Sequence, residues 1–403
     1  MSTQPTVSEH TSAAASGATT GEVLFASAAA STGPRHVEVP TAYDGILLAG
    51  FGGPEGQEDV IPFLRNVTRG RGIPDERLEE VAHHYRHFGG VSPINEHNRE
   101  LKAALEAELA ARGIDLPVYW GNRNWAPYLN EAVEQAEAAG DRTLIAIATS
   151  AYSSFSSCRQ YREDFARVLT ETGLGGTVTI DKVRPFFDHP AFVHTFIEGV
   201  RDAVATLTAD GVATSAIRVL FSTHSIPTVD ATRSGPSFLE LGEHGAYEAQ
   251  HLAVAEVVMA AQEVEGVAWN LVYQSRSGPP TQPWLEPDIN DLIETLPGEG
   301  VEAVVIVPLG FVSDHMEVMW DLDEEATESA AEHGLRSIRT PTPGIDPTYV
   351  TGLVDLVLER VNGTPAAQRP AVTELGPWFD VCRPGCCENI RAGFKPAAAG
   401  VVP

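Results

Sequence analysis

Basic residues are scarce in this chain of 403 residues. Lys and Arg number 27 against 55 Asp and Glu, which leaves a formal net charge of −28. Nucleic-acid binding needs clustered Lys and Arg to neutralise phosphates, so the deficit excludes DNA and RNA as partners. It also disfavours docking on anionic lipid. Most of the acid is expected to form a solvated surface.

Long apolar runs are also lacking. The longest, roughly residues 303–312, is about half of a membrane span, and Pro308 and Gly310 interrupt it. The first basic residue is Arg35, so the N-terminus lacks the charged region of an export signal. We expect no transmembrane segment and a cytoplasmic location. Residues 1–40, rich in Ser, Thr, Ala and Gly, are expected to be a disordered tail.

Cysteine is rare, and its distribution is uneven. Cys158 lies mid-chain, whereas Cys382, Cys386 and Cys387 fall within six positions near the end. Disulfides are unusual in a cytosolic chain, and the spacing is not that of a zinc ribbon. Four thiolates could hold a [2Fe–2S] cluster or a tetrahedral zinc ion. The alternative is inert buried thiols, but the polar surroundings of the last three favour a metal centre.

The chain does contain short apolar runs that alternate with longer amphipathic segments. Strands are expected at 45–50, 117–121, 143–149, 177–183, 216–222, 269–274 and 303–308. Helices are expected at 58–65, 96–112, 128–139, 158–171, 246–265, 288–296, 315–333 and 347–361. This alternation predicts an α/β protein with two similar Rossmann-like, doubly wound halves, 41–200 and 201–364, joined near 190–210. Residues 365–403 are expected to be a spacer and a Cys-rich tail.

Functional groups of such folds lie at the carboxyl ends of the strands. His224 follows the predicted strand 216–222, where it could act as a base or as a metal ligand. A loop histidine satisfied by the neighbouring hydroxyl groups is the alternative. Both interpretations remain open from this motif alone.

A row of acidic residues follows the predicted strand 303–308. On a helix, Glu317, Asp321 and Glu324 or Glu325 fall on one face. Like charges at this spacing destabilise an isolated helix, so the row is either a solvated face or a path for a divalent cation. Its position directly after a buried strand favours the cation path.

Glycines also follow the first predicted strand, but they lack the G-x-G-x-x-G spacing and Pro54 interrupts them. A nucleotide site is therefore not expected. Arg69 and Arg71 lie in a glycine-containing loop and could bind carboxylates. Ordinary surface charge is the alternative for these two arginines.

Together these motifs resemble the ferrochelatase family over residues 43–361. The matching segments are Ser222–Pro227, Gly310–Asp321, Gln274-Ser275 with Pro283–Asp288, Gly89–Pro93 and Thr68–Arg71. The resemblance implies two Rossmann-like halves that enclose a porphyrin cleft, and insertion of Fe²⁺ into the macrocycle. The N-terminal part is similar to actinobacterial members, which metallate coproporphyrin III to iron coproporphyrin, the precursor of haem b.

The resemblance also implies roles for single residues. His224 and Glu317 match the facing pair at the metal site, with Asp321 and Glu325 as a metal or proton relay. The residues implied in substrate binding are Ser92 and Tyr161, which match propionate-holding positions, together with Arg69, Arg71, Phe51 and His84.

Two features depart from the pattern of some relatives. Phe51 stands where these relatives have an iron-ligating Tyr, so a phenolate ligand is excluded. Thr68 and His84 stand where some relatives have Arg. The Cys-bearing tail with Cys158 resembles members that carry a [2Fe–2S] cluster.

Other functions remain open at this point. A chelatase could act on protoporphyrin IX or insert cobalt or nickel. Outside the enzymes, a tetrapyrrole carrier or an iron–sulfur sensor is conceivable, although His224 and Glu317 in their full motifs argue against both. The expected partners are a porphyrin and Fe²⁺, with neighbouring enzymes of the haem pathway as further candidates.

Overall fold

The structure is a computed structural model that describes residues 36–70, 72–278, 281–382, 385–387, 389 and 395–399. The predicted tail, except for residues 36–40, and Arg71 lie outside the described residues. No helix in this described part of the chain is long and apolar enough to cross a membrane.

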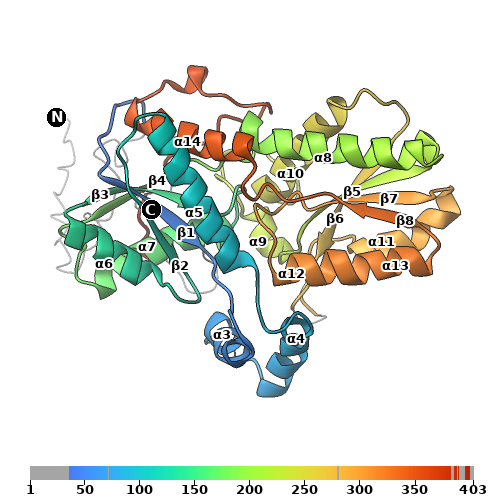
Figure 1. The fold of residues 1–403 in the computed structure, drawn as a ribbon, viewed down its shortest axis with the longest axis horizontal. Coiled ribbons are helices and arrows are strands. Elements are labelled where there is room, and N and C mark those ends of the chain that lie inside the picture. The colour runs from blue at the N-terminus through green and yellow to red at the C-terminus, as the bar shows by residue number, and fades with distance from the viewer. Residues whose placement is uncertain are drawn as a thin grey trace, which may run out of the picture.

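Two four-stranded parallel sheets form the centre of the molecule, in the orders β2-β1-β3-β4 and β6-β5-β7-β8 (Figure 1). The strands of the first sheet are β1 (Gly45–Gly50), β2 (Val118–Asn122), β3 (Thr143–Ala148) and β4 (Thr179–Lys182). Those of the second are β5 (Ile217–His224), β6 (Ala268–Gln274), β7 (Ala303–Val307) and β8 (Arg336–Arg339). Both sheets follow the same winding order. The predicted α/β class with two parallel-sheet halves is confirmed.

Helices connect the strands. They are α3 (Val60–Val67), α4 (Asp75–His87), α5 (Ile94–Ala111), α6 (Leu129–Ala139), α7 (Gln160–Glu171), α8 (Pro190–Ala209), α9 (Thr228–Thr232), α10 (Gly245–Ala260), α11 (Ile289–Thr295), α12 (Met316–Val318), α13 (Ala326–Glu332) and α14 (Pro347–Val361). Two π-helical turns are η2 (Phe155–Arg159) and η5 (Met319–Glu325). Short 3₁₀ turns are η1 (Gln57–Asp59), η3 (Thr214–Ala216), η4 (Leu296–Glu299) and η6 (Ala366–Gln368).

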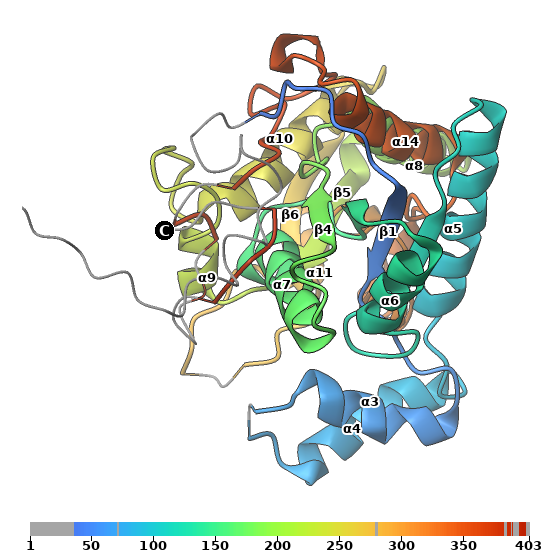
Figure 2. The same ribbon diagram turned by 90° about the vertical axis from the view of Figure 1, so that its left-hand side faces the viewer.

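Helices cover both faces of each sheet, which explains why the central strands are apolar throughout. All residues of β1 and β7 are buried. Along β1, Ile46 and Leu48 pack in the cluster that contains α5, whereas Leu47 and Ala49 pack with α6 and α7 (Figure 2). The alternation follows from successive side chains of a strand pointing to opposite faces.

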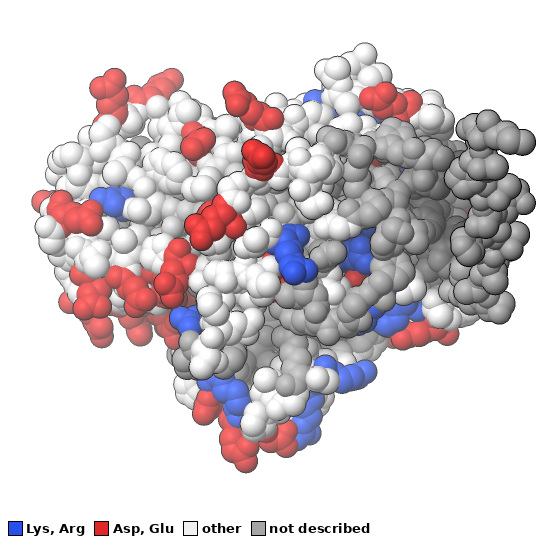
Figure 3. Space-filling model, turned by 180° about the vertical axis from the view of Figure 1, so that it is seen from behind, with Lys and Arg blue, Asp and Glu red and all other residues white. Residues whose placement is uncertain are grey.

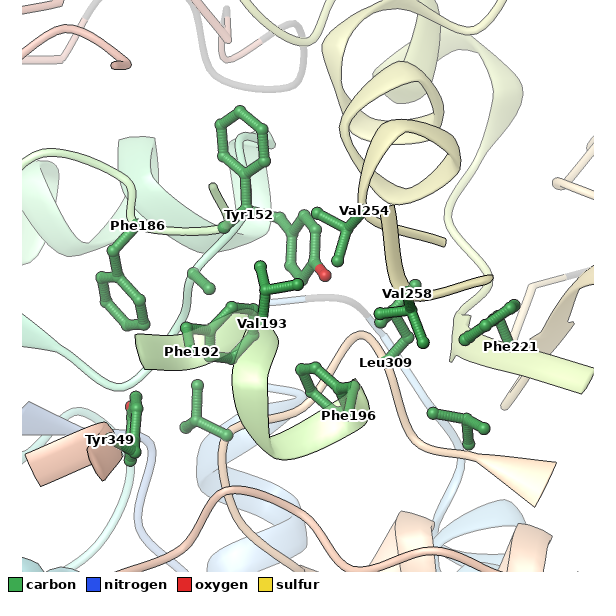
Figure 4. Close-up of a cluster of buried hydrophobic side chains, with 14 of the residues drawn as sticks. Tyr152, Phe186, Phe192, Val193, Phe196, Phe221, Val254, Val258, Leu309 and Tyr349 are labelled. Atoms are coloured by element: carbon green, nitrogen blue, oxygen red, sulfur yellow. The ribbon is translucent and has the colours of Figure 1, made fainter. Parts of the chain in front are cut away.

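The segment 190–210, predicted as the junction of the halves, contains the helix α8 of 20 residues, which connects β4 of the first sheet to β5 of the second. His189 caps its first turn and Pro190 occupies a position where proline is favoured. Phe192 and Phe196 of α8 lie in one apolar cluster with Phe186 and with Val254 of α10 (Figure 4). The two halves therefore share a core, and the sequence prediction missed α8, α4 and β8.

Helices α3 and α4 form a separate lobe below the sheets in Figure 1. The apolar side chains of the lobe, among them Phe63 and Tyr85, cluster with Met316, the first residue of α12. The lobe thus touches the helix that carries the acidic row.

The predicted spacer 365–377 is packed against the rest of the protein. Arg369 forms an ion pair of 2.6 Å with Asp380, which also accepts a hydrogen bond from the backbone N–H of Val37. Trp378 is buried against Phe187 of the first half. Buried ion pairs and an aromatic anchor therefore hold the segment that leads to the last three cysteines.

Candidate active site and four-cysteine centre

His224 is the last residue of β5 and lies in register with Gln274, the last residue of β6. Its Nδ1 lies 2.5 Å from the carbonyl oxygen of Ser225. A carbonyl only accepts hydrogen bonds, so Nδ1 carries the proton and Nε2 presents a lone pair. Nε2 lies 3.6 Å from Oε2 of Glu317. The structure therefore brings together the two residues predicted as the catalytic pair.

Glu317 reaches this position because the loop after β7 passes very close to β5. A Cβ atom on Gly310 would lie 2.1 Å from Oγ1 of Thr223, so only glycine fits there without displacement. Gln274 adds a bridge: its Nε2 donates to the backbone oxygen of Glu317 at 3.2 Å, and its Oε1 accepts from Ser222 at 2.7 Å. The strand ends thus fix the start of α12.

The predicted α-helix over 315–333 is three elements, α12, η5 and α13. The π-helical turn η5 accommodates one more residue per hydrogen-bonded turn than an α-helix. Within it, Oε1 of Glu324 lies 3.6 Å from Nε2 of His87 on α4. Oε1 of Glu325 instead accepts a hydrogen bond of 2.7 Å from the Trp320 indole. Of the two candidates for the end of the acidic row, Glu325 is the one whose charge acts on Asp321.

Asp321 is the most perturbed carboxyl group of this row. Burial is the main cause that raises its pKa to about 7, and the charges of Glu317 and Glu325 act in the same direction. A hydrogen bond from Ser275 opposes this rise. Near neutral pH, Asp321 therefore exchanges a proton readily.

A cavity of about 90 Å³ lies between the α3–α4 lobe and the acidic row. It is lined by Phe51, Phe63, Leu64, Val67, Val81, His84, Tyr85, Met316, Glu317, Trp320 and Asp321. Of the predicted site residues, Phe51, His84, Glu317 and Asp321 are thus brought to one cavity. Sites for larger ligands measure roughly 300–1,000 Å³, so this cavity as it stands is smaller than such a site.

Trp320 and His84 stack across this cavity, with ring centroids 4.0 Å apart and planes at 7°. Burial lowers the pKa of His84, and the nearby His83 and Arg77 lower it further. The imidazole is therefore mostly neutral at pH 7, which suits face-to-face stacking on the indole.

The other predicted substrate residues lie elsewhere. Ser92 is buried where a Cβ on Gly53 would contact its Oγ at 2.9 Å. The buried Tyr161 has its hydroxyl 3.5 Å from Oγ1 of Thr149. Arg69 is exposed and donates to Asn66 at 2.6 Å, and Arg71 lies outside the described residues. None of these three described residues lines the cavity.

Sequence reasoning missed several residues of the site. Gln274 and Ser275 were noticed only as a motif, although their place at the end of β6 signalled a role. Arg123, just beyond β2, lies over the Tyr161 ring at 4.0 Å, and its buried Nη2 has no hydrogen-bond partner among the described residues. Trp320 carried no sequence signal, because its stacking partner comes from a distant helix.

The four cysteines form one buried cluster, with no disulfide between them. The Sγ atom of Cys387 lies 4.0 Å from those of Cys158 and Cys386. It also accepts a hydrogen bond of 3.2 Å from the N–H of Gly235 in the second half. Hydrogen bonds from Cys158 and Cys386 lower the pKa of Cys382 and Cys387.

This donor set suits a tetrathiolate centre. Cys158 comes from η2 and the other three thiols from the tail, so the cluster joins distant segments. Two nitrogen atoms of the adjacent buried Arg162 have no hydrogen-bond partner among the described residues. A negatively charged group bound by the thiols would compensate the charge of this arginine. In the same described ranges, no group of three or more His, Cys, Asp or Glu side chains is already arranged to hold a metal ion.

The sequence of this chain is similar to those of known ferrochelatases. A sequence profile described as Ferrochelatase matches residues 43–361. A coproporphyrin III ferrochelatase from Leifsonia xyli is 67% identical over 94% of this chain and 100% of its own length. One from Streptomyces griseus is 53% identical, over 90% of this chain and 97% of its own. A protein named ferrochelatase from Rhodopirellula baltica is 46% identical, over 89% and 96%.

Proposed function

The chain belongs to the ferrochelatase family, and on that premise we propose that it inserts Fe²⁺ into coproporphyrin III to form iron coproporphyrin III for haem b. The observation that carries this function is the His224–Glu317 pair at 3.6 Å, at the carboxyl end of the second sheet. Relatives at 67% and 53% identity are named for coproporphyrin III, which favours that substrate over protoporphyrin IX.

Insertion requires that two pyrrole protons leave as the metal enters, so that charge balances. His224 accepts the two protons one after the other at Nε2, since Nδ1 is committed to the carbonyl of Ser225, and passes each on through Glu317. The nearby Glu317 carboxylate stabilises the resulting imidazolium. A role of His224 as iron ligand would use the same lone pair; the facing carboxylate favours the base role.

The acidic row along η5 then carries protons away. Asp321, with its pKa at about 7, both takes and releases a proton at neutral pH. Glu325 lies beyond it, with its Oε1 bound to the Trp320 indole. The same carboxylates present oxygen ligands to Fe²⁺ on its way to the pair.

The porphyrin enters where Trp320 and His84 now stack. A cavity of about 90 Å³ is too small for the macrocycle, so the α3–α4 lobe moves away from η5 on binding. We assign the propionates to Ser92, Tyr161, Arg69, Arg71 and His84, and we add Arg123, whose Nη2 has no hydrogen-bond partner among the described residues.

The test measures anaerobic insertion of Fe²⁺ into coproporphyrin III by the change in absorbance. The same assay is run in parallel with protoporphyrin IX. We expect His224→Ala to lower kcat by about 10²–10⁴-fold, the usual contribution of a general base. His194→Ala is the matched control, because that histidine is exposed on α8. Near-full activity of His224→Ala with normal porphyrin affinity contradicts the assignment, and equal rates on both porphyrins contradict the substrate preference.

We further propose that Cys158, Cys382, Cys386 and Cys387 hold a [2Fe–2S] cluster. When bound, such a cluster is a one-electron centre that also cross-links the segments carrying its ligands. Four thiolates also suit a tetrahedral zinc ion, so the metal and sulfide content of the isolated protein decides between the two. Visible absorption with matching iron and sulfide content supports it, and a colourless protein with stoichiometric zinc refutes it.

Three broader predictions accompany this function. The halves 41–200 and 201–364 remain the proposed division, although α14 of the second packs on α5 of the first. Neighbouring enzymes of haem synthesis remain candidate partners, because they supply the porphyrin and consume the product. A cytoplasmic location remains the expectation from sequence.

A further inference from the structure

The buried arginines of this protein follow one rule with one exception. Six arginines are buried in the described part of the chain. Five have a carboxylate oxygen within 2.8 Å; they are Arg123, Arg159, Arg184, Arg360 and Arg369. The sixth is Arg162 on α7, which is 1% exposed and has no carboxylate partner among the described residues. An unpaired buried charge is costly, so Arg162 needs negative charge from another source.

That source lies beside it. The charges that raise the pKa of Arg162 are those of Cys382, Cys158, Cys386 and Cys387, while burial acts against them. Nε and Nη2 of Arg162 donate to no group in the described ranges. The guanidinium thus lies close enough to the four cysteines for their charges to act on it, and two of its donors have no partner among the described residues.

Lys182 repeats the pattern at the end of β4. It is 3% exposed, and its ammonium donates to the backbone oxygen of Val183 at 2.7 Å. No carboxylate in the described part of the chain lies within ion-pair distance of Lys182. Burial lowers the pKa of its ammonium group, and the charges of Cys158 and Cys382 oppose that fall. The four-cysteine centre thus has two buried basic side chains beside it, and neither forms an ion pair with a carboxylate in the described part of the chain.

The positive charges of Arg162 and Lys182 match the net charge of the group that the four thiols would hold. In an oxidised [2Fe–2S] centre, two ferric and two sulfide ions leave two positive charges, and four thiolates bring the net charge to two negative units. A divalent ion with four thiolates has the same net charge. Neutral thiols would leave both cations uncompensated.

We propose that Arg162 and Lys182 are the counter-charges of the four-cysteine centre and set its preference for a group with two net negative charges. This inference deepens the proposed cofactor site. The cations act through the thiolates, which makes them positioning residues of the centre and gives them no part in the chemistry at His224.

The first test titrates the cofactor-free full-length chain with Cd²⁺ and follows thiolate-to-metal absorption. Arg162→Met should weaken Cd²⁺ binding at least about tenfold, or ~1.4 kcal/mol, and Lys182→Met should act in the same direction. Arg162→Lys, which keeps the charge, should restore most of the affinity. Arg167→Met is the matched control, because it removes the same charge from an exposed position of α7.

The proposal is overturned if Arg162→Met binds Cd²⁺ as tightly as the original chain and the Arg167→Met control do. If Arg162→Met does not fold, Lys182→Met decides by the same criterion, with folding checked by circular dichroism. The probe reports on the thiols whichever metal they normally hold. Absence of iron and sulfide in the isolated protein would thus refute the cluster without deciding this inference.

The second test applies to the protein isolated with its cluster. Reduction adds one negative charge, which the buried cations stabilise, so Arg162→Met should shift the midpoint potential to more negative values. A tenfold change in the reduced-to-oxidised ratio corresponds to about 59 mV for one electron. An unchanged potential in both Arg162→Met and Lys182→Met contradicts the proposed role.

Discussion

Asp321 shows how one neighbouring hydroxyl group tunes a site residue. Burial raises its pKa from 3.8 to about 7, and the hydrogen bond from Ser275 limits that rise. Because the folded-state pKa is the higher one, Asp321 contributes stability at low pH that is lost as the pH rises from about 4 to about 7. The protein keeps this carboxyl group at a cost in stability, which is typical of functional sites.

Removal of that hydroxyl group should shift the pH dependence of catalysis. We expect Ser275→Ala to raise the pKa of Asp321, so the rise of kcat with pH moves to higher pH, while Asp321→Asn abolishes this limb. Ser277→Ala is the control, because it is exposed two residues away. The measurement is the pH profile of kcat for coproporphyrin III metallation. A Ser275→Ala profile that coincides with that of Ser277→Ala would show that Asp321 is not the titrating group.

A methyl group at position 310 should separate the catalytic pair. The nearest atom to a Cβ on Gly310 would be Oγ1 of Thr223 at 2.1 Å, so Gly310→Ala must push the loop before α12 away from β5. We expect kcat to fall at least about tenfold and stability to fall by about 1–3 kcal/mol. Gly298→Ala, where no atom lies within 4 Å, is the matched control. Unchanged kcat would mean that the loop position does not control Glu317.

At the scale of elements, η5 decides which acidic side chains act together. An α-helical reading of the sequence leaves Glu324 and Glu325 equivalent as ends of the row. The π-helical turn separates them, since Glu324 contacts His87 and Glu325 contacts Trp320. Such turns are frequent at functional sites.

Deletion of Glu324 should convert η5 to regular α-helix and rotate Glu325 away from Asp321. We expect the rate of metal insertion to fall at least about tenfold, with helix content and cluster content retained. Glu324→Ala removes the same side chain but keeps the turn, so it should retain most of the activity. The rate of metal insertion and the helix content by circular dichroism are measured for both variants and compared. Equal activity of the two variants would show that the π-helical turn is dispensable.

For the whole molecule, the net charge of −28 is not distributed evenly. In the view of Figure 3, acidic side chains are spread over the second half, whereas Lys and Arg lie near the centre and, together with acidic side chains, on the α3–α4 lobe. The arginines of that lobe include Arg65, Arg69, Arg77 and Arg86. The overall field repels a porphyrin with four propionates and attracts Fe²⁺.

Added salt should therefore act with opposite signs on the two substrates. Screening weakens long-range fields beyond a Debye length of about 10 Å at 0.1 M. We expect NaCl to lower the apparent KM for coproporphyrin III and to raise that for Fe²⁺. Sucrose at matched osmolality is the control and should change neither. Shifts of the reverse sign would mean that local contacts outweigh the overall field.

The site was predictable where its residues follow strands. His224 and Glu317 come after apolar runs, and parallel strands place their carboxyl ends at one edge of the sheet. Trp320, Arg123 and the bridge through Gln274 were not predicted as parts of the site, because their partners are far apart in sequence. The junction predicted near 190–210 falls on α8, which connects β4 of the first sheet to β5 of the second. The helix itself was not predicted, and its apolar residues pack in a core shared by both halves.

The sequence by itself determined the α/β class, the two parallel sheets and the family, because apolar periodicity and local motifs carry that information. It also established the charge deficit and the unusual grouping of three cysteines. Only the tertiary structure decided that Nε2 of His224 faces Glu317, that burial raises the pKa of Asp321 to about 7, and that Arg162 is buried near the four cysteines without a carboxylate partner among the described residues. These properties depend on burial and on distances between remote segments, which only the folded chain defines.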